Sequence, residues 1–270
     1  MVETPNSLST RLILPALSLC WRELIRFMRQ RSRIIGALAT PILFWIVIGA
    51  GMGHSFRAEM PGGNNFIEYF FPGTLVMILL FTAIFSEISI IEDRREGFLQ
   101  SVLVAPVSRM AIVLGKVLGG TILATVQGLL FLLLAPLVGI HLGIISFLAA
   151  LAVIFIVSFA LAGLGFCIAW RMSSTQGFHV IMNLFLIPMW FLSGAMFPAD
   201  GAKGIMRWLM SANPLTYGVS ALRQSLYWTT SANLRLPPWS VCLGISLLFA
   251  AVMFTLSSMM AGRRVAADLQ

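Results

Sequence analysis

Residues 144–170 read IISFLAALAVIFIVSFALAGLGFCIAW, a stretch without a charged side chain that ends just before Arg171. About 20 consecutive apolar residues are enough for a helix to cross the hydrocarbon layer of a membrane. A helix that is apolar on all sides over such a length suits lipid better than the surface of a soluble core. The stretch is therefore predicted to be a membrane-spanning helix.

The whole chain has the same character. Of its 270 residues, 59% are hydrophobic and 10% are charged, and the mean hydropathy is +0.92. Soluble domains carry roughly 25% charged residues, so this composition excludes a soluble globular domain. One membrane domain is expected over residues 34–262, preceded by a cytoplasmic segment, 1–33, and followed by a cytoplasmic tail, 263–270.

Apolar stretches of similar length recur along the chain and predict an all-α integral membrane protein with six transmembrane helices. The predicted spans cover residues 34–53, 69–91, 108–138, 144–170, 178–197 and 239–261. Most Lys and Arg residues fall on one side of these spans, which by the positive-inside rule places both termini in the cytoplasm. The net charge of +8 is explained in this way. A nucleic-acid partner is not expected, because the basic residues flank spans and form no aromatic-interleaved patch.

An amphipathic helix is predicted within residues 8–33. At 100° per residue its arginines share one face and its large apolar side chains share the other. Such a helix suits the membrane interface, in contact with lipid; the alternative is a simple basic flank before the first span. The basic face holds Arg22, Arg26, Arg29 and Arg33, and the apolar face holds Leu17, Trp21, Leu24, Phe27 and Met28.

The connection between the second and third spans is the most densely charged part of the sequence. After the charged run 92–96, apolar residues repeat at spacings of four, as in the pairs Phe98/Val102 and Leu99/Leu103. This spacing predicts a short cytoplasmic helix over 92–104 that rests on the membrane helices and offers charge to a partner. The alternative is a solvated loop. The candidate partner-binding residues are Glu92, Asp93, Arg94, Arg95, Glu96, Gly97 and Gln100.

Between the fifth and sixth spans, residues 198–238 are external in this topology but rich in apolar side chains. Two short re-entrant helices are expected there, in or on the outer leaflet; the alternative is an ordinary structured loop. Asn213 precedes Pro214 and is predicted to separate them, because the residue before a proline disfavours helix.

Residues suited to catalysis are scattered. His54, His141 and His179 have no carboxylate or cysteine at metal-ligand spacing. The pair Gly115-Lys116 resembles the end of a phosphate-binding loop, but the Ser or Thr that should follow is replaced by Val117. We expect no enzyme activity, cofactor or metal in this chain.

Glu87 is the one carboxylate predicted inside a span, near its cytoplasmic end. We expect it at the membrane edge, paired with Arg94, Arg95 or an N-terminal arginine. The alternative is a proton relay, because ionisable residues within membrane spans often mark ion pathways.

Four motifs resemble those of the membrane subunits of ABC-2-type ABC exporters, and the resemblance covers nearly the whole chain. They are FPGTLVM at 71–77, EDRREGFLQSVLVAPVSRMAIVLGK at 92–116, PMWFLSGAMFP at 188–198 and NPLTYGVSALR at 213–223. Within the second motif, Phe98 and Gln100 depart from the Thr and Glu that the family often has.

The resemblance implies a six-span half-transporter of the bacterial cytoplasmic membrane, which pairs with a second copy or a homologous permease. ATP and Mg²⁺ would be bound by a separate ATPase subunit, and residues 92–104 would be the coupling helix that it pushes. The apolar spans favour an amphipathic or hydrophobic cargo. Two other hypotheses are a proton-coupled secondary transporter that uses Glu87 and a membrane assembly factor that transports nothing.

Overall fold

The computed structural model describes residues 12–52, 66–105, 107–197, 203–228 and 236–267, with only the backbone described at 31–33 and 263–267. Predictions about residues 8–11, the Arg33 side chain and the tail beyond 267 lie outside this description. The described part is helical throughout. Its helices are α1 (Leu14–Arg29), α2 (Arg31–Met52), α3 (Phe66–Ser86), α4 (Ile88–Arg95), α5 (Phe98–Val104), α6 (Arg109–Leu132), η2 (Ala135–Val138, a 3₁₀ turn), α7 (Ile144–Arg171), α8 (Thr175–Phe191), α9 (Ile205–Ala212), α10 (Pro214–Leu226) and α11 (Trp239–Ala267).

Five helical stretches are long and apolar enough to cross a membrane: Ile34–Gly51, Phe66–Arg95, Arg109–Leu132, Ile144–Arg171 and Trp239–Gly262. The all-α membrane class is thus confirmed. The predicted span at 178–197 corresponds to α8, which has 17 residues and contains Pro188. At 1.5 Å per residue α8 is roughly 25 Å long, somewhat short of the ~30 Å hydrocarbon layer. The sixth span therefore stays a prediction.

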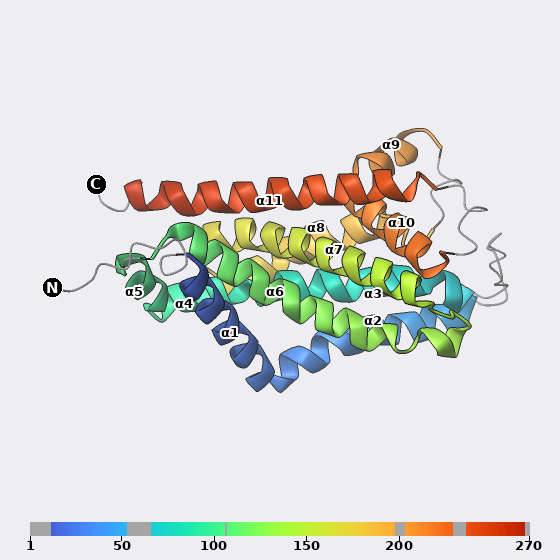
Figure 1. Cartoon of the computed structure of the whole chain (residues 1–270), viewed down its shortest axis with the longest axis horizontal. Helices are drawn as coiled ribbons and strands as arrows, with labels where there is room; N and C mark the ends of the chain where they lie inside the picture. The colour runs from blue at the N-terminus through green and yellow to red at the C-terminus, as the bar shows by residue number, and fades with distance from the viewer. Residues whose placement is uncertain (1–11, 53–65, 106, 198–202, 229–235, 268–270) are drawn as a thin grey trace.

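The long helices lie side by side around α3, which is buried along almost its whole length. Helices α6 and α7 pack on α3 and on each other, α11 packs mainly on α7, and α2 packs on α3. One end of the bundle carries α4, α5, the start of α1 and the end of α11, whereas α9 and α10 lie at the other end (Figure 1). We call these the α5 end and the α9 end.

Helix α1 packs along α6 because two glycines open a groove for it. A Cβ atom on Gly115 would lie 2.7 Å from the Ala16 carbonyl oxygen, and one on Gly119 would lie 2.9 Å from Glu23 Cβ. Glycines four residues apart share a helix face and let two backbones approach closely. In Figure 1, α1 leans against α6 and meets α2 at an angle.

The predicted amphipathic character of α1 is confirmed, but the helix has three faces rather than two. Phe27, which we placed on the membrane-facing side, is buried, while Leu17, Trp21 and Met28 are more than half exposed. Sequence periodicity separated apolar from basic residues, but only the packing against α6 divides the apolar residues into protein-facing and exposed sets.

The prediction of one helix over 92–104 is wrong. Residues 92–95 continue α4, directly below the second span, and only α5 is a separate short helix. Gly97 lies between them in a left-handed conformation with φ 76°. A residue without a Cβ adopts this conformation at little cost, so Gly97 ends α4 and redirects the chain.

At the α9 end, the predicted boundary between two short helices is confirmed. The Asn213 side chain accepts a hydrogen bond from Leu215 N, and Pro214 occupies the first position of α10. Both residues are favoured at a helix start. Helix α10 is largely buried against α7 and α11, whereas α9 is mostly exposed.

A partly buried hydrogen bond joins the end of α10 to α3: the hydroxyl of Tyr227, the residue after α10, donates to Glu68 Oε1 at 3.0 Å. Burial raises the pKa of the Tyr227 phenol, and the Glu68 carboxylate raises it further. The phenol therefore stays a neutral donor at neutral pH.

Replacing this phenol tests the contact. We expect Tyr227→Phe to lower the free energy of unfolding by about 1.5–3 kcal/mol, because a bond to a charged acceptor is lost. The matched control is Tyr217→Phe, whose hydroxyl donates to the Ser211 carbonyl in an exposed position. Thermal unfolding in lipid nanodiscs measures both, and equal losses would refute the assignment.

Candidate functional site

The α5 end contains a buried group of charges centred on Asp93 of α4. Asp93 is fully buried. It accepts hydrogen bonds from Arg22 at 2.8 and 3.0 Å and from Arg26 at 2.6 Å, both on α1. Lys116 Nζ of α6 also donates to it. One carboxylate thus joins α1, α4 and α6.

Further carboxylates complete what we call the Asp93 cluster. Lys116, 2% exposed, also donates to Glu23 Oε1 at 2.6 Å and to Ser89 Oγ at 3.1 Å. Arg26 Nη2 lies 3.0 Å from a Glu92 oxygen and 3.3 Å from a Glu96 oxygen. The cluster consists of Arg22, Glu23, Arg26, Glu92, Asp93, Glu96 and Lys116.

The net stability gained from such a cluster is small, because desolvation offsets much of the attraction between buried charges. Removing one partner is different, since it strands the others. The Asp93 hydrogen bonds raise the pKa of the Arg22 guanidinium, so Arg22 remains charged. Its guanidinium also lies 3.6 Å from the centre of the Phe98 ring. Phe98, a departure from the family pattern, thereby connects α5 to the cluster.

The neighbouring arginines of α4 bind the end of α7. Arg94 donates to the carbonyls of Trp170 and Met172 at 2.8 and 2.9 Å. Arg95 donates twice to the Ser173 carbonyl. The last carbonyls of a helix have no hydrogen-bond donor within the helix, and the two arginines act as their donors.

The expectation that the charges of 92–104 face a partner is therefore corrected for the two residues that the fold turns inward, Asp93 and Arg94. Both lie on α4, which directly follows the buried helix α3, and their side chains therefore contact other helices of the protein. Arg95 and Glu96 are exposed, although each makes the contact described above, and Gln100 is exposed on α5. Val104, at the end of α5, is 86% exposed.

The predicted basic face of α1 is divided in the same way. Arg22 and Arg26 turn towards Asp93, whereas Arg29 is exposed at the end of the helix. The sequence indicated neither Lys116 nor Glu23 as a member of the Asp93 cluster. The spacing Gly115-x-x-x-Gly119 beside Lys116 was the available signal, because it indicates close helix packing.

We expected Glu87 to pair with an arginine, and in the described part of the chain it does not. It is 1% exposed, and neither carboxylate oxygen has a hydrogen-bond partner in the described part of the chain. Glu87 occupies the turn between α3 and α4, and this turn directs its side chain inward, between α6 and α7.

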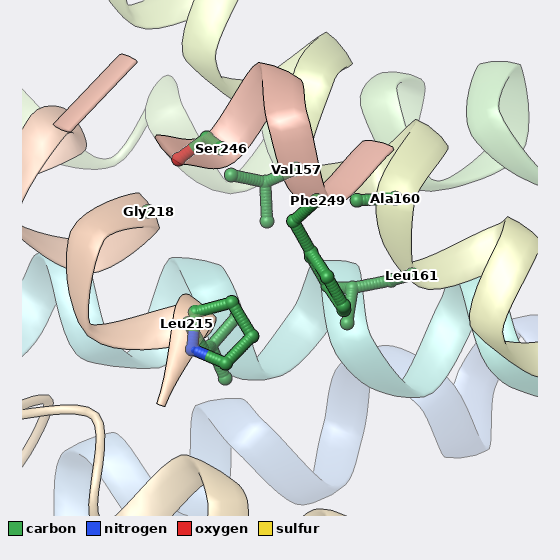
Figure 2. Close-up of a pocket in the computed structure, with 8 residues that line it drawn as sticks. Val157, Ala160, Leu161, Leu215, Gly218, Ser246 and Phe249 are labelled. Atoms are coloured by element: carbon green, nitrogen blue, oxygen red, sulfur yellow. The ribbon is translucent and has the colours of Figure 1, made fainter. Parts of the chain in front are cut away.

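Two cavities differ in what they can hold. Figure 2 shows a void between α7, α10 and α11, lined by Val157, Leu215 and Phe249 among others. Its volume of about 10 Å³ is room for at most one water molecule. A larger apolar groove of about 160 Å³ lies between α2, α3 and α8, next to Phe44, Phe81 and Trp190.

Comparison with known proteins agrees with this architecture. The profile of the ABC-2 type transporter family matches residues 16–227. Nodulation protein J of Rhizobium leguminosarum bv. viciae is 26% identical over 238 residues, covering 87% of this chain and 88% of that protein. Nodulation protein J of Sinorhizobium fredii is 29% identical, with 87% of each chain covered.

A third relative is a daunorubicin resistance ABC transporter permease protein of Streptomyces coeruleorubidus. It is 24% identical over 215 residues, covering 77% of this chain and 74% of that protein. With a family match over most of its length, this chain belongs to the ABC-2 type transporter family and is a multi-pass membrane subunit of an ABC transporter.

Proposed function

We propose that the chain is the permease subunit of an ATP-driven exporter, with six spans and both termini in the cytoplasm of a bacterial cell. A separate ABC ATPase subunit binds ATP and Mg²⁺ and docks at the α5 end. The chain moves an amphipathic or hydrophobic cargo out of the cytoplasm or the inner leaflet. The apolar spans support this cargo class, as does similarity to a permease named for daunorubicin resistance.

One observation supports the coupling proposal: α5 has an exposed side that a partner could contact, and a buried side that packs on the rest of the protein. Val104 is 86% exposed, whereas Leu99 is 4% exposed. Through Gly97, α5 continues into α4, which the Asp93 cluster joins to α1 and α6 and which Arg94 joins to α7. A push on α5 would therefore reach three membrane-associated helices at once.

We also propose that a second copy covers the groove between α2 and α8. Only 17% of the most apolar part of α2 is buried. Val47, Val180 and Leu184 are each more than 60% exposed. An extended apolar face of this kind is typical of an interface with protein or lipid, and pairing here would place the apolar grooves of the two copies against each other.

Docking is tested by placing a charge on the outer edge of α5. In complex with the ATPase subunit, Val104→Asp should lower permease-stimulated ATP hydrolysis at least tenfold, because a carboxylate would have to be desolvated at the interface. The matched control is Ile205→Asp, at a residue 81% exposed on α9. Equal activity of the two variants, or ATP hydrolysis by the permease alone, would refute the proposal.

The secondary-transporter hypothesis keeps one supporting observation, the buried and unpartnered Glu87. It predicts cargo movement in proteoliposomes driven by a pH gradient, without ATP or the ATPase. The exporter proposal predicts no movement under these conditions. If cargo does not move with either energy source, the assembly-factor hypothesis gains.

A further inference from the structure

Of the buried acids at the α5 end, Glu87 has the surroundings least able to stabilise a negative charge. Within the described residues, neither Glu87 oxygen accepts a hydrogen bond, and the hydroxyl of its neighbour Ser86 donates to the Ala83 carbonyl. An isolated carboxylate in an apolar interior is so costly that such a group normally takes up a proton. The other buried acids at this end, Glu23 and Asp93, both have cationic partners.

The space for the Glu87 side chain is made by glycines on both sides. A Cβ atom on Gly120 of α6 would lie 2.9 Å from Glu87 Oε1, and one on Gly165 of α7 would lie 3.1 Å from Glu87 Cγ. The side chain thus occupies a slot between two spans, at the turn where α3 gives way to α4. A change in its charge acts directly on this turn.

A cation lies one helical turn away on the same face of α6. Lys116 precedes Gly120 by four residues, and residues at this spacing are stacked along one face. Lys116 now bonds Glu23, Asp93 and Ser89. Asp93 also forms ion pairs with Arg22 and Arg26. Its carboxylate would therefore keep cationic partners if Lys116 moved away.

The remaining titratable groups near Glu87 are few. Glu23 faces it from α1, across Lys116, and Asp93 follows it on α4. On α7, Cys167 follows Gly165 by two residues, and Arg171 ends the same helix. Among these groups, Lys116 is the cation placed to exchange between the Asp93 cluster and Glu87.

We propose that Glu87 is a proton-binding site: it holds a proton in the arrangement described here and releases it to water when Lys116 leaves Glu23 and Asp93 to pair with it. The exchange balances charge, since a neutral acid becomes a carboxylate as an ammonium arrives. It also removes the Lys116 contact that fastens α1 to α6. Protonation of Glu87 is thereby linked to the attachment of α1, and this holds whether or not an ATPase drives transport.

Infrared spectroscopy of the full chain in lipid nanodiscs tests the site, because a protonated carboxylic acid has its own C=O stretching band. We expect this band at neutral pH in the unsubstituted protein and its loss in Glu87→Gln. A band that survives in Glu87→Gln, or is missing at neutral pH before substitution, overturns the proposal.

The exchange of Lys116 is tested by the pH at which the band disappears. Glu23→Gln frees Lys116 for Glu87 and should lower that pH by at least about one unit, whereas Lys116→Met should raise it. Glu96→Gln, at the exposed edge of the cluster, is the matched control and should leave it unchanged. If Lys116→Met does not fold, the Glu23→Gln variant alone tests the exchange. A shift of the band's disappearance pH in Glu23→Gln no larger than that in Glu96→Gln overturns the exchange.

Discussion

Asp93→Ala is expected to lower the free energy of unfolding by about 3–5 kcal/mol and to abolish transport. The substitution leaves Arg22, Arg26 and Lys116 around a buried position that has lost its shared carboxylate, and stranding buried charges costs this much in other proteins. Thermal unfolding in nanodiscs gives the loss of stability, and uptake into inverted vesicles gives the loss of transport.

Glu96→Ala is the control for this experiment. It removes a carboxylate from the same cluster, but the Glu96 side chain is 59% exposed. Exposed ion pairs contribute about 0–1 kcal/mol, so we expect a loss within that range and retained transport. If Asp93→Ala and Glu96→Ala lower the free energy of unfolding by similar amounts, the burial of Asp93 does not account for the stability of the α5 end.

Gly115→Leu is expected to detach α1 from α6. The first side-chain atom would already lie 2.7 Å from the Ala16 carbonyl and 2.8 Å from Leu19 Cβ, and a backbone carbonyl cannot rotate out of the way as a side-chain end can. Overpacking alone costs about 1–3 kcal/mol. Displacing α1 also breaks its ion pairs with α4 and α6, so we expect a larger total loss.

Limited proteolysis detects the detachment, because a released α1 is cleaved faster than a packed one. Gly244→Leu provides the comparison. Gly244 lies in α11 with open space where its Cβ would be, so the same substitution should leave cleavage of α1 unchanged. Protection of α1 in Gly115→Leu would mean that α1 does not depend on the glycine groove.

The apolar spans and the boundary at Asn213 were predictable because both depend on local signals. A long apolar run has no stable alternative to a membrane helix, and Asn-Pro starts a helix through its own side chain and ring. The break at Gly97 was missed although its signal was local too. The apolar spacing of 98–103 favours one continuous helix, and Gly97 just before it is the local signal for a break.

The Asp93 cluster was not predictable, because its partners are 71 residues apart between Arg22 and Asp93 and 93 apart between Glu23 and Lys116. Charge on a surface segment usually means contact with water, and only the packing of α1 on α6 turns Asp93 into an interior residue. The burial of Glu87 has the same origin. It requires glycines on two other helices, which no local pattern connects to residue 87.

The packing of α1 on α6 sets an order for biosynthesis. The ribosome makes α1 first, yet the groove at Gly115 and Gly119 and the ammonium of Lys116 do not exist until roughly ninety more residues have followed. Until then the nascent chain must shelter the apolar side chains of α1 elsewhere, and Leu17, Trp21 and Met28, which stay exposed in the finished protein, suit temporary residence at the lipid surface. Completion of the third span would then recruit α1 from the membrane surface, making this attachment a late checkpoint in assembly.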